Sequence, residues 1–232
     1  MKRSERLVDM TKYLMERPHT LIALPFFAKR YGAAKSSISE DLAILKHTLA
    51  SNQDGILETV AGAAGGVRYI PFLGKKHAEV YLSDLSTRIE DPSRILAGGF
   101  VYLSDILGNT QDLRKIGELV ATHYAYEEID AVMTVETKGI ALAQAVARFL
   151  DVPFVTARKR SKVTEGATVS VNYISSSLSR VSKMELPTRA LKKEAKVLIV
   201  DDFMKGGGTL TGMEELSRRP SGLRKTTNPD NS

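Results

Sequence analysis

The segment Val197-Leu-Ile-Val-Asp-Asp-Phe-Met-Lys-Gly-Gly-Gly-Thr209 contains the most specific pattern in the chain. Four apolar residues lead into two adjacent aspartates, and three glycines and a threonine follow. This order predicts a buried parallel strand, an acidic pair at its carboxyl end, and a loop that binds phosphate at the start of a helix. A phosphorylated ribose fits both parts. Carboxylates accept hydrogen bonds from ribose hydroxyls, while loop amides and the Thr209 hydroxyl bind the 5′-phosphate.

The same segment resembles the phosphoribosyl pyrophosphate (PRPP) signature of type I phosphoribosyltransferases. An ordinary strand, turn and helix with a glycine-rich turn is the alternative interpretation. Two aspartates directly after an apolar strand favour phosphate binding over that alternative. The residues of this segment that we expect to bind PRPP are Asp201, Asp202, Lys205, Gly206, Gly207, Gly208 and Thr209.

The composition limits the class of protein. With 232 residues, 43% of them hydrophobic, the chain can form one large domain or two modest ones with packed cores. No uninterrupted apolar run reaches the length of about 18 residues that a membrane span needs, so we expect no membrane partner. The absence of cysteine excludes disulfides and thiolate metal sites, and the four histidines lack ligand spacing. We expect a cytoplasmic protein without a metal or a cofactor.

The net charge of +6 is concentrated at the two ends of the chain. Residues 1–74 and residues 217–232 each carry an excess of three positive charges, and the residues between them are balanced. Excess Lys and Arg in an amino-terminal domain indicates a polyanionic partner. A solvated basic surface is the alternative explanation.

Residues 1–74 have the pattern of a winged helix-turn-helix domain. We predict a first helix over residues 4–17 with Ser4 as its cap, and a second over residues 25–31 that Gly32 ends.

A third helix is predicted to begin at the tight connection that Lys35 ends. Ser37 and Glu40 have the spacing of a capping box. Two strands over residues 56–60 and 67–70, joined by a glycine-rich tip, form the expected wing. The apolar stripe of the third helix consists of Ile38, Leu42, Leu45 and Leu49.

In a winged helix domain the first turn of the third helix enters the major groove of DNA. Lys35 can reach a phosphate there, and Arg68 on the wing can reach the minor groove or the backbone. We expect Glu40 and Asp41 to serve the helix dipole rather than the DNA. A dimerisation module whose serines only cap the helix is the alternative. The candidate DNA-binding residues are Lys35, Ser36, Ser37, Ser39 and Arg68.

Residues 75–216 are predicted to form an α/β domain with a parallel sheet. Two helices and a short strand come first, and strands and helices then alternate. The predicted helices are 77–88, 111–124, 139–150 and 209–216, and the predicted strands lie in 98–103, 129–135, 152–156 and 197–200. In the helix over 111–124 we expect four residues to face inward, namely Leu113, Ile116, Leu119 and Val120.

Ligands bind such sheets outside the carboxyl ends of the strands. Three loops are predicted to meet there: residues 136–139, residues 158–160, and the acidic, glycine-rich loop. The amides and cations of the first two suit a pyrophosphate, although each loop alone is a weak signal. These loops add five candidate PRPP-binding residues, namely Thr137, Lys138, Gly139, Arg158 and Lys159.

Residues 162–186 alternate between apolar and polar side chains around a polar tip at 175–179. This pattern predicts a β-hairpin that projects beside the site, where a loop often closes over the substrate in transferases. The apolar residues of the return strand are Val181, Met184 and Leu186.

Taken together, these motifs resemble the purine operon repressors of Gram-positive bacteria, over roughly residues 1–216. The segments that carry the resemblance are Ala34–Leu42, Ala61–Gly66, Gly98–Gly108, Val132–Ile140, Lys162–Gly166 and Asp201–Lys205. The resemblance implies a winged helix fused to a phosphoribosyltransferase-like domain that serves as an effector domain and has no catalytic residues.

The resemblance further implies a homodimer that represses purine biosynthesis and transport genes by binding operator DNA. PRPP is the implied effector, and it weakens operator binding. Tyr102 is a secondary candidate, because in the family it lies near the effector site of the partner. The alternative is an active purine phosphoribosyltransferase with an accessory amino-terminal domain. Lys205 argues against it, since a cation beside the phosphate favours tight binding of the ground state, which does not accelerate chemistry.

The end of the chain departs from the family pattern. Residues 217–232 contain one large apolar residue, Leu223, and no periodicity, so we predict a disordered tail. We interpret this end as a truncation or a frame change. The sheet is then expected to lack strands and to expose an apolar edge, and a non-functional remnant becomes a third hypothesis.

Overall fold

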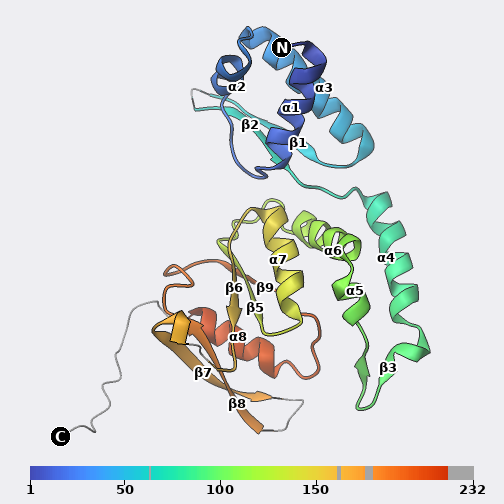
Figure 1. Cartoon of the computed structure of the whole chain (residues 1–232), viewed down its shortest axis with the longest axis vertical. Coiled ribbons are helices and arrows are strands. Elements are labelled where there is room, and N and C mark those ends of the chain that lie inside the picture. The colour runs from blue at the N-terminus through green and yellow to red at the C-terminus, as the bar shows by residue number, and fades with distance from the viewer. Residues whose placement is uncertain (63, 161–162, 176–179, 219–232) are drawn as a thin grey trace, which may run out of the picture. The chain divides into compact units, whose positions relative to one another are not determined.

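The computed structural model describes residues 1–62, 64–160, 163–175 and 180–218 (Figure 1). The predicted tip of the hairpin and nearly all of the predicted tail lie outside the described residues. The chain divides into two compact units, one of residues 1–127 with 145–151, and one of residues 128–144 with the chain from Val152 onward. The domain boundaries that we predict at 74/75 and 216/217 stay predictions.

The first unit begins with the predicted winged helix. Helices α1 (Arg3–Met15), α2 (Leu24–Tyr31) and α3 (Lys35–Asn52) precede the antiparallel strands β1 (Ile56–Val60) and β2 (Gly66–Ile70). A bridge between Ile22 and Val67 attaches the segment before α2 to the wing. The three helices and the wing enclose one core, whose buried residues are Met10, Leu14, Ile22, Phe27, Tyr31, Ile38, Leu42, Leu45, Leu57, Val67 and Tyr69.

Two predicted helix caps are wrong. Helix α1 begins at Arg3, after Lys2, whose backbone N–H donates to the Glu5 carboxylate at 2.9 Å, so Ser4 lies inside the helix. Helix α3 begins directly after Ala34, so Ser37 lies in its first turn. In both cases the helix begins before the predicted polar residue. At α1 the Glu5 carboxylate caps the Lys2 N–H instead, and at α3 no side chain of the N-cap residue Ala34 forms a cap.

Asp41 has a different role from the predicted one. Its side chain is fully buried and accepts hydrogen bonds from Arg6 Nε at 2.5 Å and Arg3 Nε at 2.9 Å. Burial raises the pKa of Asp41, but the two arginines outweigh burial and hold this pKa below its ordinary value. This ion pair ties α1 to α3. Glu40 reaches only Arg3, at 3.4 Å, and stays exposed.

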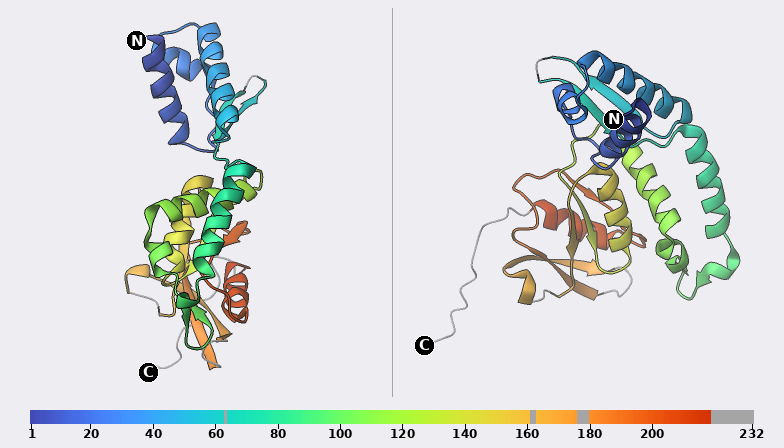
Figure 2. Two further views of the ribbon diagram at one scale, coloured as in Figure 1. Left: turned by 90° about the vertical axis from the view of Figure 1, so that its right-hand side faces the viewer. Right: turned by 45° about the horizontal axis from the view of Figure 1, so that its top comes forward.

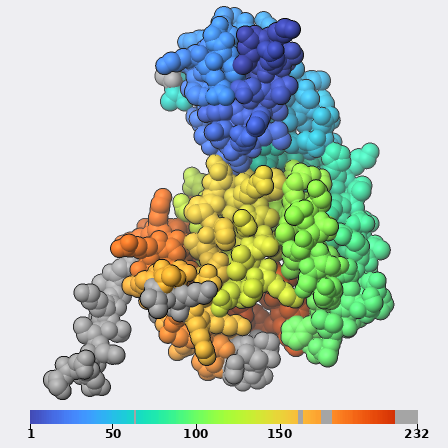
Figure 3. Space-filling view, in the orientation of Figure 1, coloured from blue at the N-terminus to red at the C-terminus, as the bar shows by residue number. Residues whose placement is uncertain are grey.

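The first unit continues with α4 (Lys75–Ile89), the 3-10 turn η1 (Pro92–Arg94), β3 (Ile95–Leu96), β4 (Phe100–Val101), α5 (Ser104–Gly108) and α6 (Thr110–His123). The predicted strand in 98–103 is part of a two-stranded hairpin, and α5 is a helix that was not predicted. Helix α4 buries none of its residues, and Figure 3 shows its outer side open to solvent.

The predicted inward face of α6 is only partly right. The four leucine, isoleucine and valine side chains are only half-buried, and the helix instead buries Asp112, Gly117, Glu118 and Ala121. Asp112 is buried because the Arg88 guanidinium donates to both of its carboxylate oxygens, at 2.6 and 2.9 Å. Gly117 is buried because a β-carbon there would lie 2.8 Å from the Ala145 carbonyl. Such contacts leave no trace in hydrophobic periodicity.

The second unit contains the predicted parallel sheet, in the order β6-β5-β9. Its elements are β5 (Ala131–Val135), β6 (Phe154–Ala157), the 3-10 turn η2 (Val163–Glu165), β7 (Thr168–Ser175), β8 (Arg180–Pro187), β9 (Val197–Ile199) and α8 (Gly208–Arg218). Helix α7 (Gly139–Leu150) begins in this unit and ends in the first. The predicted α/β fold class is therefore confirmed.

The β7–β8 hairpin forms as predicted, but it packs on α8 as part of the core (Figure 2). Val171, Met184 and Leu186 are buried in the same cluster as Met213 of α8. Val181 was predicted in the same apolar set but is 69% exposed. Residues 181 and 184 are an odd number of positions apart, so they lie on opposite faces of the strand.

We predict that replacing Asp41 by alanine lowers the free energy of unfolding by about 2–3 kcal/mol, because Arg6 loses the partner of its buried guanidinium. Glu40→Ala is the matched control, since it removes the neighbouring carboxylate, which meets only Arg3 at the surface, and we expect a change below about 0.5 kcal/mol. Urea denaturation of the full chain measures both. Equal effects of the two substitutions would contradict this role of Asp41.

Candidate functional site

The parallel sheet brings the three predicted loops to one edge. Strand β5 pairs with β6 so that Val135 faces Ala157, and with β9 so that Met133 faces Ile199. The residues that follow these strands are Glu136, Arg158 and the aspartate pair. Because parallel strands point the same way, the three segments leave the sheet at its carboxyl edge, as the sequence predicts.

The start of α7 lies directly against Asp201. A β-carbon at Gly139 would lie 2.6 Å from Asp201 Oδ1 and 2.2 Å from the hydroxyl oxygen of the buried Thr134. No real side chain fits at these distances, so residue 139 must be glycine for the first loop and the aspartates to approach each other this closely. Gly139 therefore sets the geometry of the site through its missing side chain.

Asp201 is in an environment that disfavours its charge. Burial raises its pKa to about 6, and the negative charge of Asp202 contributes in the same direction. The backbone N–H of Asp202 donates to Asp201 Oδ1 at 3.1 Å and opposes this rise in part. Near neutral pH Asp201 is a carboxylate with few protein donors, and such an acceptor is suited to ligand hydroxyls.

The glycine-rich loop leads directly into helix α8. Gly207 has a φ of +73°, which favours glycine, and α8 begins at the next residue. The Thr211 amide bonds to the Gly207 carbonyl at 2.9 Å, which closes the first turn. The amides before Thr211 are those that bind anions at helix amino termini. Lys205 is exposed and Thr209 is half-buried.

The other two loops place their cations differently. Thr137 and Lys138 are exposed beside the start of α7, and the Glu136–Thr137 peptide bond is cis. The Arg158 guanidinium lies between two carboxylates, 3.4 Å from Glu136 and 3.5 Å from Glu165. The Lys159 amide donates to Glu136 Oε1 at 2.9 Å, and its side chain is exposed.

Sequence reasoning missed Glu136 and Glu165 as partners in this site. Glu136 follows a strand and Glu165 precedes a hairpin, so no spacing rule connects them with Arg158. The only clue in the sequence is that both are acidic residues beside a predicted anion-binding site, where negative charge is unexpected. Tyr102 lies between β4 and α5 in the first unit and is 45% exposed; its predicted role stays a prediction.

The candidate DNA-binding residues lie on α3 and the wing. Lys35, Ser36 and Ser39 are exposed in the first turns of α3, and the Ser39 hydroxyl donates to the Lys35 carbonyl at 3.0 Å. Ser37 is half-buried. Arg68 forms an ion pair with Glu58, its register partner on the wing. The structure thus places four of these residues on one helix and Arg68 on the adjacent hairpin.

The described residues contain no helix that is long and apolar enough to cross a bilayer. Within the same residues, no three His, Asp or Glu side chains lie close enough to hold a metal ion.

Comparison with known proteins identifies both parts of the chain. The family described as "Bacterial purine repressor, N-terminal" matches residues 2–71, and "Phosphoribosyl transferase domain" matches residues 103–219. The purine biosynthesis transcriptional repressor PurR of Bacillus subtilis is 54% identical over 93% of this chain and 75% of its own length. The chain belongs to the bacterial purine repressor family.

Other relatives extend this result. The purine biosynthesis transcriptional activator PurR of Lactococcus lactis strain IL1403 is 49% identical over 93% of this chain and 80% of its own length. An adenine phosphoribosyltransferase of Saccharomyces cerevisiae has a TM-score of 0.53 at 22% identity, over 61% of this chain and 84% of its own. It shows the phosphoribosyltransferase fold only. The purine repressor relatives are thus named as transcriptional regulators, one as a repressor and one as an activator.

We predict a pH-dependent gain in stability when Asp201 is replaced by asparagine. An unfolded aspartate has a pKa of about 3.9, while the folded value is about 6. The folded state therefore holds a proton that the unfolded state has lost, and the free energy of unfolding falls as pH rises from about 4 to about 6.

Asp201→Asn has no proton to lose at this position, so its free energy of unfolding does not fall between pH 4 and pH 6. The variant is therefore expected to be more stable than the parent by about 2 kcal/mol at pH 7.5 and by little at pH 4. Chemical denaturation at the two pH values measures the difference. A variant that is less stable at pH 7.5, or a difference independent of pH, would refute the strained state of Asp201.

Proposed function

We propose that the chain is a transcriptional repressor of purine biosynthesis and transport genes whose operator binding PRPP weakens. The observation that carries this proposal is the pairing, in one chain, of a winged helix with an acidic, glycine-rich loop at the edge of a parallel sheet. Membership of the purine repressor family supports purine biosynthesis genes as the regulated targets.

Three groups of residues in the effector site bind three parts of PRPP: the ribose, the 5′-phosphate and the pyrophosphate. Asp201 and Asp202 accept hydrogen bonds from the ribose hydroxyls. The loop amides of residues 206–208 and the Thr209 hydroxyl take the 5′-phosphate, with Lys205 beside them. Thr137, Lys138 and Gly139, together with Arg158 and Lys159, face the pyrophosphate. Each group offers the partner that its part of the ligand requires.

The winged helix supplies the DNA contacts. Lys35 and Ser36 are exposed at the amino end of α3, where recognition helices meet base edges and phosphates. Ser37 and Ser39 extend this polar face. Arg68 lies on the wing and is paired with Glu58. We propose that this ion pair opens when Arg68 contacts DNA.

A homodimer is part of the proposal. Helix α4 and the β3–β4 hairpin expose apolar side chains in the first unit, among them Val80 at 66% and Ile95 at 68%. Large exposed apolar groups on neighbouring elements indicate a protein interface. A dimeric winged helix also suits a two-part operator.

The repressor is proposed to have lost transferase activity. The purine repressor relatives cited above are named as transcriptional regulators, and Lys205 places a cation next to the glycine-rich loop. Tight binding of the ground state raises affinity without lowering the barrier to chemistry. The mechanism is linkage: PRPP binds more tightly to the state with low operator affinity, and shifts the population toward it.

Operator binding with and without PRPP tests the proposal. A duplex that the protein selects from a random-sequence pool serves as operator, and fluorescence anisotropy gives the dissociation constant. Saturating PRPP is expected to weaken binding by about 10-fold or more. An operator dissociation constant that PRPP leaves unchanged would refute the proposal that PRPP is the effector.

Substitutions of two lysines on α3 test the proposed DNA contact in the same assay. Lys35→Ala is expected to weaken binding with and without PRPP and to reduce the salt dependence by about one phosphate contact. Lys46→Ala changes an exposed lysine further along the same helix and is expected to leave affinity unchanged. Equal effects would show that α3 does not enter the groove by its amino end.

An active purine phosphoribosyltransferase is the second candidate, because the phosphoribosyl transferase domain family matches residues 103–219. It predicts formation of a nucleotide from PRPP and a purine base. Incubation of the full chain with both substrates decides between the candidates, since the repressor predicts no turnover.

A further inference from the structure

Arg158 lies at the proposed pyrophosphate end of the effector site, but acidic side chains already surround it. Glu136 Oε2 lies 3.4 Å from its Nη1, and Glu165 Oε1 lies 3.5 Å from its Nε. All three side chains are about 70% buried. One guanidinium between two carboxylates has a net negative charge, which opposes an incoming anion.

The two carboxylates are held unequally. Glu136 directly follows β5, and its second oxygen accepts the Lys159 N–H at 2.9 Å, so the sheet edge fixes it. Glu165 ends the short turn η2. The contacts of both carboxylates with Arg158, 3.4 and 3.5 Å, are longer than the 2.7–3.2 Å of an ordinary N–H···O hydrogen bond, so it is the Lys159 N–H that sets Glu136 apart. The attraction between Glu165 and Arg158 is therefore mainly Coulombic.

The backbone of Arg158 cannot move to avoid this competition. Its N–H donates to the Glu185 carbonyl at 2.9 Å, and its carbonyl accepts the Glu185 N–H at 2.7 Å. The Glu185 carboxylate is paired with Lys183 at 2.5 Å. Only the Arg158 side chain and its partners are left to respond to a ligand.

We propose that Glu165 is a built-in competitor of the effector: it occupies Arg158 in the empty site and leaves when a pyrophosphate group enters. A pyrophosphate offers paired oxygens and more than one negative charge, which a guanidinium binds better than a single distant carboxylate oxygen. Glu136 stays in place and orients the guanidinium. Glu165 thereby raises the effector concentration at which the site fills. This inference rests on the proposed function.

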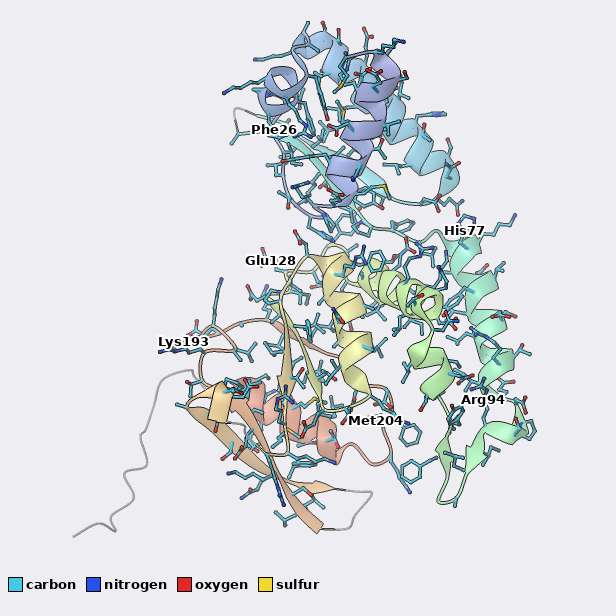
Figure 4. All side chains as sticks on the ribbon, viewed as in Figure 1. Phe26, His77, Arg94, Glu128, Lys193 and Met204 are labelled. Carbon is cyan, nitrogen blue, oxygen red and sulfur yellow. The ribbon has the colours of Figure 1, made fainter. Side chains whose placement is uncertain are left out.

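Calorimetric titration of the full chain with PRPP, and separately with inorganic pyrophosphate, tests the proposal. Glu165→Gln is expected to tighten binding of both ligands about three- to fivefold, since a partly exposed ion pair contributes up to about 1 kcal/mol. Glu128→Gln is the matched control. It makes the same charge change at the amino end of the sheet, where Glu128 is 89% exposed and pairs with Lys196 (Figure 4).

A thermodynamic cycle separates competition at Arg158 from a general charge effect. In the Arg158→Gln background, Glu165→Gln is expected to change affinity by less than about 1.5-fold. The proposal is overturned if Glu165→Gln binds both ligands no more tightly than the parent, if Glu128→Gln tightens binding as much, or if the gain persists without Arg158.

The outcomes also separate this inference from the proposed function. If the parent chain binds PRPP and Glu165→Gln gives no gain, the inference fails and the effector site stands. If the parent binds neither PRPP nor pyrophosphate, both fail.

Discussion

The parallel hydrogen bonding of β5 to both β6 and β9 is the constraint on which the site depends. It places the ends of three strands at one edge, although the loops that follow them are separated by tens of residues in the sequence. The close approach of Gly139 to Asp201 then fixes the first loop against the third. A side chain at residue 139 or a shift of register in β9 would separate the groups that the proposed function assigns to PRPP.

Two charged groups of the site, Asp201 and Arg158, have unusual surroundings. Asp201 keeps a charge that its burial disfavours, as the rise of its pKa to about 6 shows. Arg158 sits between two carboxylates before any ligand arrives. Burial makes the charged form of Asp201 unfavourable. In the proposed function a sugar pyrophosphate supplies hydroxyl donors to Asp201 and anionic oxygens to Arg158.

Much of this structure was predictable, and the failures have a common cause. The apolar run before Asp201, the glycines after it, and the alternation in the hairpin predicted the strands and the start of α8 correctly, because they are local patterns. The buried face of α6, the Asp41 ion pair and the packing of β7–β8 on α8 depend on partners far away in sequence. Asp41, Asp112 and Glu165 are the clearest examples. Periodicity assigns these charged residues to solvent, but distant arginines pair with them: Arg3 and Arg6 with Asp41, Arg88 with Asp112, and Arg158 with Glu165.

The central claim is that the aspartate pair after β9 binds the ribose of PRPP and thereby controls the winged helix. Calorimetric titration of PRPP into the parent chain and into the double variant Asp201→Asn/Asp202→Asn tests it most directly, because asparagine keeps the size of both side chains and removes their charge. The account predicts that the variant stays folded and binds PRPP at least about 10-fold more weakly, as expected when charge-assisted hydrogen bonds to the ligand are lost. An unchanged dissociation constant in a folded variant would contradict it.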